Sequence, residues 1–232
     1  MITSPHPCSY LEEKLAQTVF LSPANKPTNK DYSILVQNGF RRSGEHIYRP
    51  NCEDCRACIS VRVCVKDYFA NHYYLKRSFK RIVKKNEDLV VTHSADGDAP
   101  ELYPLYEGYI SARHREGDMY PSTPQQYASF LQQNLGNCEY LVFTLEEKPV
   151  AVAVTDVLTD GIAAVYTFFD CELSGRSLGT MAILYQIQHC QRLGLPYLYL
   201  GYWIKECKKM NYKDSFQPLE YYVDDAWTRQ MP

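Results

Sequence analysis

A run of apolar segments in the second half of the chain constrains the fold most. Residues 139–145, 149–158 and 161–170 are rich in Val, Ala and aromatic side chains, and only two or three residues separate each from the next. Links this short join antiparallel neighbours. The turn SGRSLGT (174–180) and a helix-like segment over 181–194 follow, before a further strand at 196–203. The sequence therefore predicts an α+β fold with a mixed, largely antiparallel sheet flanked by helices.

The first part of the chain has a different character. We expect strands over HIYRP (46–50) and ISVRVCV (59–65), the second with one buried face and with Arg62 and Cys64 together on the other. Helices are expected near 73–88, 101–115 and 124–134. The polar stretch 92–100 predicts a boundary between a smaller, basic and cysteine-rich lobe, residues 1–91, and a larger lobe, residues 92–232.

Positive charge is concentrated in one segment. The chain has a net charge of −2, yet residues 41–85 alone carry +8. In the predicted helix 73–88 the basic side chains recur four positions apart, so they share faces of the helix. This pattern is typical of a solvated face, but beside the arginines of 41–62 it also suits a phosphate backbone. The candidate RNA-binding side chains are Lys76, Arg77, Lys80, Arg81 and Lys84.

Four cysteines are candidate metal ligands. Cys52, Cys55 and Cys58 form a C-x-x-C-x-x-C motif, and Cys8 or Cys64 would supply a fourth thiolate, the number that zinc or an iron–sulfur cluster needs. The alternative is free thiols on a substrate-binding lobe. No secretory signal and no apolar run of membrane-spanning length is evident, so we expect reduced cysteines, a cytoplasmic protein and no membrane contact.

The turn before the helix at 181–194 is a candidate anion site. Backbone N–H groups at the start of a helix lack intrahelical partners, and the helix dipole favours negative charge there. Arg176, Ser177 and Gly179 lie in this turn. In acyltransferases of the GNAT fold the corresponding turn holds the pyrophosphate of coenzyme A, and the following strand diverges to admit the acyl group. An ordinary strand–turn–helix connection is the alternative.

Several segments resemble the bacterial branch of the arginyl-tRNA–protein transferase family. They are CSYLEEK…VF (8–20), NGFRRSGEHIYRPNCEDCRACISVRV (38–63), KRSFKRIVKKNEDL (76–89), VYTFFD (165–170) and SLGT…LGLPYLYLGYWI…KMNYKDSFQPLE (177–220). The resemblance implies a GNAT-like C-terminal lobe and transfer of leucine from leucyl-tRNA to the N-terminal Asp or Glu of a protein. Proteins marked in this way enter N-degron degradation. The choice of leucine over arginine rests on the resemblance to the bacterial branch.

An aminoacyl ester is an activated donor and an α-amine, with a pKa of about 7.7–8.0, is a competent nucleophile, so no cofactor is required. Positioning and oxyanion stabilisation would supply most of the catalysis. As candidates to orient the amine or assist proton transfer we take Asp156, Tyr166, Asp170 and Tyr202. An acidic acceptor needs a cation, for which the candidates are Arg41 and Arg42 or, alternatively, Arg49 and Arg62.

Two other functions remain compatible with the sequence. An acyl-CoA-dependent N-acetyltransferase would use the same fold, although it would need a more glycine-rich turn than GRSLGT and would leave the basic segment without a purpose. A non-catalytic RNA-binding protein with a cysteine metal site would explain the basic segment and the cysteines. That alternative leaves the strand–turn–helix–strand of 161–203 unexplained.

Overall fold

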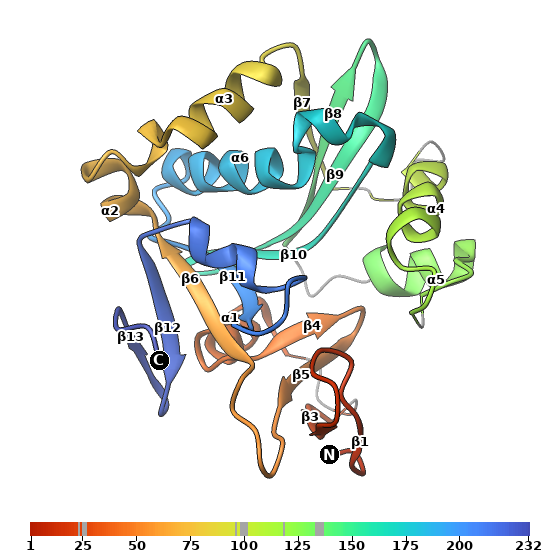
Figure 1. Ribbon diagram of the computed structural model, residues 1–232, viewed down its shortest axis with the longest axis vertical. Helices are drawn as coiled ribbons and strands as arrows, with labels where there is room; N and C mark the ends of the chain where they lie inside the picture. Colours follow the sequence, from red (N-terminus) through yellow and green to blue (C-terminus); the bar gives the residue numbers. More distant parts are fainter. Residues whose placement is uncertain (23, 25–26, 96, 98–101, 118, 133–136) are drawn as a thin grey trace.

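The computed structural model describes residues 1–22, 24, 27–95, 97, 102–117, 119–132 and 137–232. Its centre is a large twisted sheet with helices on both faces (Figure 1). In spatial order, the eight strands that the described residues contribute are β13 (Ala226–Thr228), β12 (Leu219–Val223), β6 (Ile59–Cys64), β11 (Tyr197–Trp203), β10 (Gly161–Phe169), β9 (Lys148–Val157), β8 (Cys138–Leu145) and β7 (Val90–Ser94).

The pairing confirms the predicted sheet. β10 and β11 run parallel, and the other neighbouring strands run antiparallel. Smaller sheets lie at the N-terminal end: β1 (His6–Pro7) pairs with β2 (Leu15–Ala16), and β5 (His46–Pro50) lies between β3 (Thr18–Phe20) and β4 (Arg41–Ser43). The chain is thus a mixed α+β protein in which short hairpin links produce the β8–β9–β10 meander, as their lengths predict.

Helices cover both faces of the sheet. The helices are α1 (Asn29–Gln37), α2 (Val65–Ala70), α3 (Arg77–Lys85), α4 (Leu102–Arg113), α5 (Pro124–Tyr127) and α6 (Leu178–Arg192). Short helical turns form η1 (Tyr73–Leu75), η2 (Ala128–Gln132), η3 (Cys171–Arg176) and η4 (Asn211–Ser215). The expected helix at 73–88 is therefore shorter than predicted, α6 begins three residues earlier than predicted, and the last two residues of the helix predicted at 124–134 lie outside the described residues.

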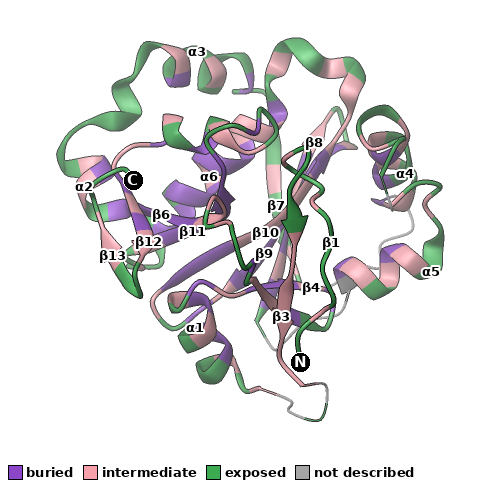
Figure 2. Cartoon of the chain, turned by 60° about the horizontal axis from the view of Figure 1, so that its bottom comes forward, coloured by how far each residue is buried: buried purple, intermediate pink, exposed green. Residues whose placement is uncertain are grey.

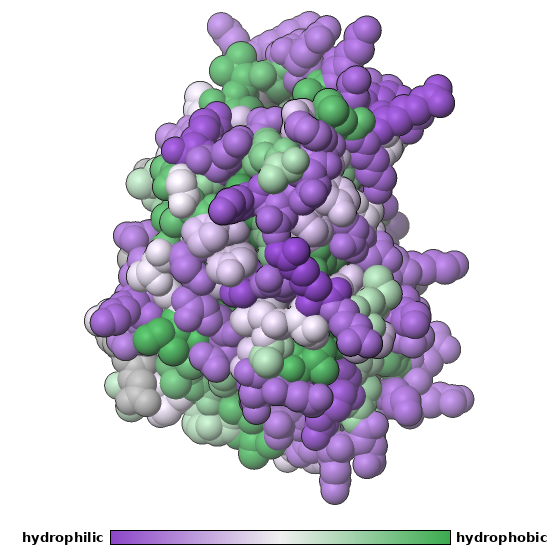
Figure 3. Space-filling view, turned by 90° about the vertical axis from the view of Figure 1, so that its left-hand side faces the viewer, coloured by the Kyte–Doolittle hydropathy of each residue, from purple (hydrophilic) through white to green (hydrophobic). Residues whose placement is uncertain are grey.

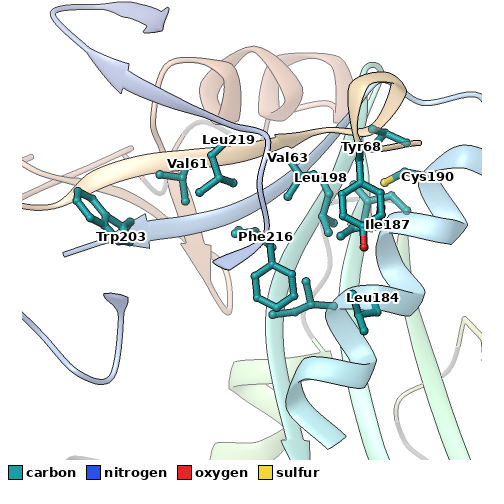
Figure 4. Packing of buried hydrophobic residues seen from close by; sticks show 14 of the residues in the cluster. Val61, Val63, Tyr68, Leu184, Ile187, Cys190, Leu198, Trp203, Phe216 and Leu219 are labelled. Atoms are coloured by element: carbon teal, nitrogen blue, oxygen red, sulfur yellow. The ribbon is translucent and has the colours of Figure 1, made fainter. Parts of the chain in front are cut away.

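Strand β9 shows how the sequence places these layers. Ala151 and Ala153 pack in the cluster that includes α6, whereas Val152 and Val154 pack in the cluster that includes α4. Alternate residues of a strand point to opposite faces, so an uninterrupted apolar run is what a sheet covered on both sides requires. On the α6 face, Leu184 and Ile187 pack with Val61, Val63 and Leu198 (Figure 4), joining β6, β11 and α6 in one core.

Strand β6 differs from its prediction. The expected exposed face is buried, because side chains from neighbouring strands pack over Arg62 on that face, namely Tyr197, Tyr199, Glu220 and Trp227. Ser60, Arg62 and Cys64 are buried, as are Val61 and Val63, and Figure 2 colours β6 mostly as buried. The alternation of polar and apolar residues was correct, but the polar face meets other polar and aromatic side chains of the protein and not water.

The sheet contains strands from both sides of the predicted boundary between residues 91 and 92. β6 comes from the first segment and its partners β11 and β12 from the second, while β7 crosses the boundary itself. Residues 96 and 98–100 of the stretch 92–100 lie outside the described residues. The division into lobes 1–91 and 92–232, and with it the smaller cysteine-rich lobe, therefore stays a prediction.

Candidate functional site

Two strands separate in the middle of the sheet. β10 and β11 are paired only from Gly161–Ala163 to Tyr197–Tyr199. Beyond this point β10 remains paired with β9, and β11 remains paired with β6. Both strands carry an irregularity at the point of separation, between Ala164 and Tyr166 and between Tyr199 and Gly201. The sheet therefore opens where a parallel pair would otherwise continue.

Arg41 fills the start of this opening. Its Nη2 donates a hydrogen bond to the carbonyl oxygen of Ala164 on β10. Its guanidinium also lies against Gly201 of β11, where a Cβ atom would come within 3.1 Å of Nε. Gly201 has a φ of +77°, so glycine suits both the backbone and the close contact. Arg41 thus bridges the two diverging strands, and its buried Nη1 has no hydrogen-bond partner among the described residues.

Lys213, a residue that the sequence analysis missed, lies beside Arg41. Its Nζ donates a hydrogen bond to the carbonyl oxygen of Tyr202, and the side chain is buried. Burial, reinforced by the positive charge of Arg41, lowers the pKa of Lys213 to about 7. The sequence carries no local signal for this burial, because Lys205, Lys208 and Lys209 lie in the same polar segment and are exposed.

Tyr202 connects this opening to a surface pocket. Its hydroxyl donates a hydrogen bond to the carbonyl oxygen of Gly39, 2.9 Å away, and its ring lies 6.2 Å from that of Tyr48. Burial raises the pKa of the Tyr202 hydroxyl, so it stays protonated. The pocket has a volume of about 330 Å³, and the side chains that matter here are Arg49, Ser60, Tyr202, Tyr222 and Asp225.

Arg49 is one of two accessible cations that line this pocket. The other is Arg56, whose guanidinium donates to the carbonyl oxygens of Cys52 and Cys55. About a third of the Arg49 side chain is exposed, its guanidinium stacks on Phe40 at 5.2 Å, and Nη1 donates a hydrogen bond to the carbonyl oxygen of Asn38. The carboxylate of Asp225 lies 3.9 Å from Nη1. Asp225 sits in the β12–β13 turn and is largely exposed. A carboxylate is therefore already placed against Arg49, held in water-accessible space by this long ion pair and by a hydrogen bond of 3.4 Å from the hydroxyl of Tyr222.

Arg42 and Asp156 are paired with each other. Nε and Nη2 of Arg42 donate to the two carboxylate oxygens of Asp156 at 2.6 and 2.7 Å, and the Arg42 side chain is fully buried. The hydroxyl of Tyr32 donates to the same carboxylate at 3.0 Å. Thus one predicted substrate-binding residue and one predicted catalytic residue form a bidentate pair that joins β4 to β9, away from the surface pocket. Their predicted roles stay predictions.

Arg62 is also engaged by neighbours in the protein. Its guanidinium stacks between Tyr197 at 3.5 Å and Trp227 at 4.2 Å. Nε donates to Glu220 at 2.8 Å and Nη1 to the hydroxyl of Tyr199 at 3.1 Å. These contacts explain why an arginine can occupy the middle of a buried strand. Arg62 therefore does not share the surface pocket of Arg49, although the sequence analysis gave the two together as candidates to bind the acidic acceptor.

The remaining predicted catalytic residues occupy two further places. Tyr166 is packed among Tyr106, Tyr109 and Phe130, and its buried hydroxyl has no hydrogen-bond partner in the part of the chain that the structure describes. Asp170 instead caps η3, because its Oδ1 accepts a hydrogen bond from the backbone N–H of Glu172 at 2.8 Å. Tyr202 therefore borders the pocket, while Tyr166 and Asp170 do not line it.

The turn before α6 is supported from α3. Arg176 donates two hydrogen bonds to Asp88, at 2.7 and 2.8 Å, and a third to the carbonyl oxygen of Lys85. Ser177 adopts a left-handed conformation, and Gly179 packs against the ring of Phe169. Arg176 thus fixes the turn against the basic helix. The first N–H groups of α6, a 15-residue helix, lie in this turn.

A groove of about 1250 Å³ lies between α2, η1, α3 and α6. Tyr74, Leu75, Phe79 and Leu184 supply apolar surface. Figure 3 faces this side of the molecule and shows hydrophilic side chains projecting near its top with apolar patches between them. Lys76, which precedes α3, and the four predicted RNA-binding side chains on α3 are exposed, and these four, Arg77, Lys80, Arg81 and Lys84, line the groove. Aromatic and basic groups therefore share one surface.

Cys8, Cys52, Cys55 and Cys58 lie near one another. Burial raises the pKa of the Cys58 thiol to about 12, with smaller contributions from Cys52, Cys8 and Cys55. Thiolates are the metal-binding form, so a metal would have to displace this proton. The described residues bring one group of three His, Cys, Asp or Glu ligand atoms within 4.8 Å of one another, and none of these cysteines belongs to it. The cysteine metal site stays a prediction.

Replacing Lys213 should change how stability depends on pH. The unfolded chain keeps this lysine protonated up to a pKa of about 10.4, whereas the folded chain releases the proton near pH 7. Between these two pH values the unfolded chain binds one proton more than the folded chain. Lys213 therefore raises the free energy of unfolding of the wild type by up to about 1.4 kcal/mol for each unit by which the pH increases. Lys213→Met should lack this rise, as urea unfolding at pH 7 and pH 9 would measure. Parallel pH dependences of the two proteins would contradict the assignment.

Two family models and several known proteins match this chain. Family models described as arginine-tRNA-protein transferase, N terminus, and arginine-tRNA-protein transferase, C terminus, match residues 6–81 and 101–223. The aspartate/glutamate leucyltransferase of Pseudomonas aeruginosa (strain LESB58) is 48% identical over 225 residues, which are 97% of this chain and 94% of that protein. The enzyme of the same name from Alcanivorax borkumensis is 48% identical over 228 residues, or 98% and 92%.

More distant similarity adds little. A solved structure, L-PGS from Bacillus licheniformis, aligns with a TM-score of 0.48 at 10% identity, over 64% of this chain and 46% of that chain, and supports no conclusion about fold or function. No helix in the described residues is both long enough and apolar enough to cross a membrane. The two family matches and the full-length relatives show that this chain belongs to the arginine-tRNA-protein transferase family.

Proposed function

We propose that this protein transfers leucine from leucyl-tRNA to the N-terminal Asp or Glu of proteins in the cytoplasm, and so marks them for N-degron degradation. The observation that carries the proposal is the near-complete match to relatives named aspartate/glutamate leucyltransferase. We further propose that the larger part of the sheet acts as a GNAT-like acyltransferase lobe. The parallel β10–β11 pair that diverges beyond Ala163 and Tyr199 supports this comparison.

The acceptor would bind in the pocket that Arg49 and Tyr202 line. Its volume of about 330 Å³ suits one side chain and the adjoining amine. Arg49 would bind the acceptor's side-chain carboxylate, a geometry that a planar guanidinium favours. Asp225 already places a carboxylate 3.9 Å from Arg49. Because Asp225 is exposed and its ion pair is long, displacing it costs little, as is usual for surface pairs.

The donor would approach from the opposite face of the sheet. The groove beside α3 supplies basic side chains for phosphates and aromatic side chains, such as Tyr74, on which bases stack. Arg176 holds the C-terminal end of α3 next to the start of α6 through Asp88 and Lys85. The 3′ end of the tRNA would therefore reach the N–H groups of that turn, and the leucyl ester would extend into the opening between β10 and β11.

The reaction needs few chemical groups. The neutral amine of the acceptor attacks the ester carbonyl carbon, a peptide bond forms, the bond to the ribose oxygen breaks, and the proton lost by nitrogen goes to that oxygen. Arg41 places positive charge at the opening, where the oxyanion develops. Lys213, with its pKa lowered to about 7, is only partly protonated near neutral pH, which limits the positive charge beside Arg41. This scheme requires no cofactor, and a metal on Cys52, Cys55 and Cys58 would be structural.

Replacing Arg49 should remove selection for acidic acceptors. A hydrogen bond to a charged group contributes about 1.5–3 kcal/mol, so Arg49→Met should lower kcat/KM for peptides that begin with Asp or Glu roughly 10- to 100-fold. Transfer to Ala-initiated peptides and the Kd for leucyl-tRNA should change little. Steady-state transfer of radiolabelled leucine to matched peptides would measure both.

Arg115 provides the control for this experiment, because it is exposed and stacks on Tyr120 at 5.8 Å much as Arg49 stacks on Phe40. Arg115→Met should leave acceptor selection unchanged. If Arg49→Met kept the preference for acidic peptides, the acceptor pocket would be placed wrongly. If the wild type used arginyl-tRNA as well as leucyl-tRNA, or gave no transfer, the proposed reaction itself would be wrong.

Neutralising part of the α3 groove should weaken tRNA binding in a salt-dependent way. Lys80→Gln with Lys84→Gln removes two exposed ammonium groups, so the slope of log K against log salt should fall by roughly 1 to 2. Binding titrations with leucyl-tRNA over a range of salt concentrations would measure the slope. Lys148→Gln, an exposed lysine at the start of β9, should leave it unchanged. Equal slopes for all three proteins would exclude α3 from the tRNA-binding surface.

A further inference from the structure

A cluster of two histidines and one glutamate lies at the β7 edge of the sheet and has no part in the proposed reaction. His93 comes from β7, Glu139 from β8 and His189 from α6. One ligand atom from each lies within 4.8 Å of the other two. His189 Nε2 is 2.9 Å and His93 Nδ1 is 3.6 Å from the same Glu139 oxygen, Oε2. The three side chains thus converge on one point from three elements.

The fold fixes this convergence. His93 is paired in register with Leu141, so Glu139, two residues from Leu141, projects on the same face as His93. Leu141 belongs to the core cluster that includes α6, so this face is the one that α6 covers. Tyr185 and His189 are four residues apart and share one side of that helix. Each of the three ligands therefore has its direction set by regular secondary structure.

A second layer of contacts orients the ligands. The Nε2 atom of His93 is 3.0 Å from the hydroxyl of Tyr185, which leaves Nδ1 directed toward Glu139. Metal-binding histidines in proteins usually have their second nitrogen occupied in this way.

The distances suit zinc. Nitrogen and oxygen ligands lie about 2.0–2.2 Å from Zn²⁺, so two of them in tetrahedral geometry are about 3.4 Å apart. The observed separations of 2.9 and 3.6 Å lie on either side of that value. Two imidazoles and a carboxylate are a donor set that zinc favours. Roughly a third of the His93 and Glu139 side chains is exposed, so a cation can enter from solvent.

We propose that His93, Glu139 and His189 bind Zn²⁺, which ties the edge strand β7 to β8 and α6 and leaves a fourth coordination position to water. The site is separate from the cysteine motif and does not rest on the proposed transferase reaction. Its effect would be to hold the last strand of the sheet against the helix that covers it. Edge strands gain most from such a constraint, because they have a hydrogen-bonded neighbour on one side only.

Histidine-selective NMR tests this site directly. The chain has six histidines, so protein labelled with ¹⁵N at histidine, stripped of metal and titrated with excess ZnCl₂ should show ring shifts at His93 and His189 and not at the other four. Zinc bound by the cysteines would leave these two rings unchanged. Such a result, or no ring shift in the folded protein, would overturn the proposal.

Substitutions distinguish the proposed zinc ligands from residues that take no part in zinc binding. Zinc should raise the Tm of the wild type, and His93→Gln should abolish both that rise and the shift of His189. His46→Gln, which replaces an exposed histidine on β5, should retain both. Tyr185→Phe should weaken zinc binding roughly 10- to 100-fold through lost orientation of His93. An unchanged zinc affinity in folded His93→Gln would overturn the proposal.

Discussion

The insertion of β6 between β11 and β12 is the constraint on which the rest of the structure depends. A strand from residues 59–64 becomes an interior strand of a sheet whose other members come mostly from beyond residue 137. The buried Arg42–Asp156 ion pair also joins the early segment to the sheet, because Arg42 lies on β4 and Asp156 on β9. Breaking such a pair by removing one partner typically costs 3–5 kcal/mol, because the other charge stays buried without compensation. The early part of the chain is therefore tied to the sheet by both pairing and charge.

The candidate site follows from that insertion. Ser60 of β6, Tyr202 of β11, Arg49 at the end of β5 and Asp225 of the β12–β13 turn meet in one pocket, although they are distant in sequence. Arg41 reaches from β4 into the opening between β10 and β11. Thus the proposed acceptor pocket and the proposed acyl opening both use residues from the first fifty positions, and Tyr202 lies between them. The basic groove lies elsewhere, beside α3 and α6.

The periodicity of apolar residues and the short links between them predicted the sheet, and several specific sequence segments indicated the family. The sequence did not show which partners β6 would have, because a strand with one apolar and one polar face has the same sequence pattern whether the polar face meets water or buried partners such as Glu220 and Tyr199.

The same limit affected the arginines. The sequence predicted Arg41, Arg42, Arg49 and Arg62 as candidates to bind the acceptor carboxylate. Only the structure shows that Arg49 is accessible and that the other three are buried. Lys213 was missed because nothing local distinguishes it from the exposed lysines nearby.

Native-state hydrogen exchange of the β6 amides is the most direct measurement of the central claim, that the early segment and the later strands form one cooperative sheet. If β6 is an integral interior strand, amides of residues 59–64 and 197–203 should exchange with the same opening free energy and the same denaturant dependence. A markedly lower opening free energy for residues 59–64, with 197–203 still protected, would show that the early segment docks on a sheet that is stable without it and would contradict the account.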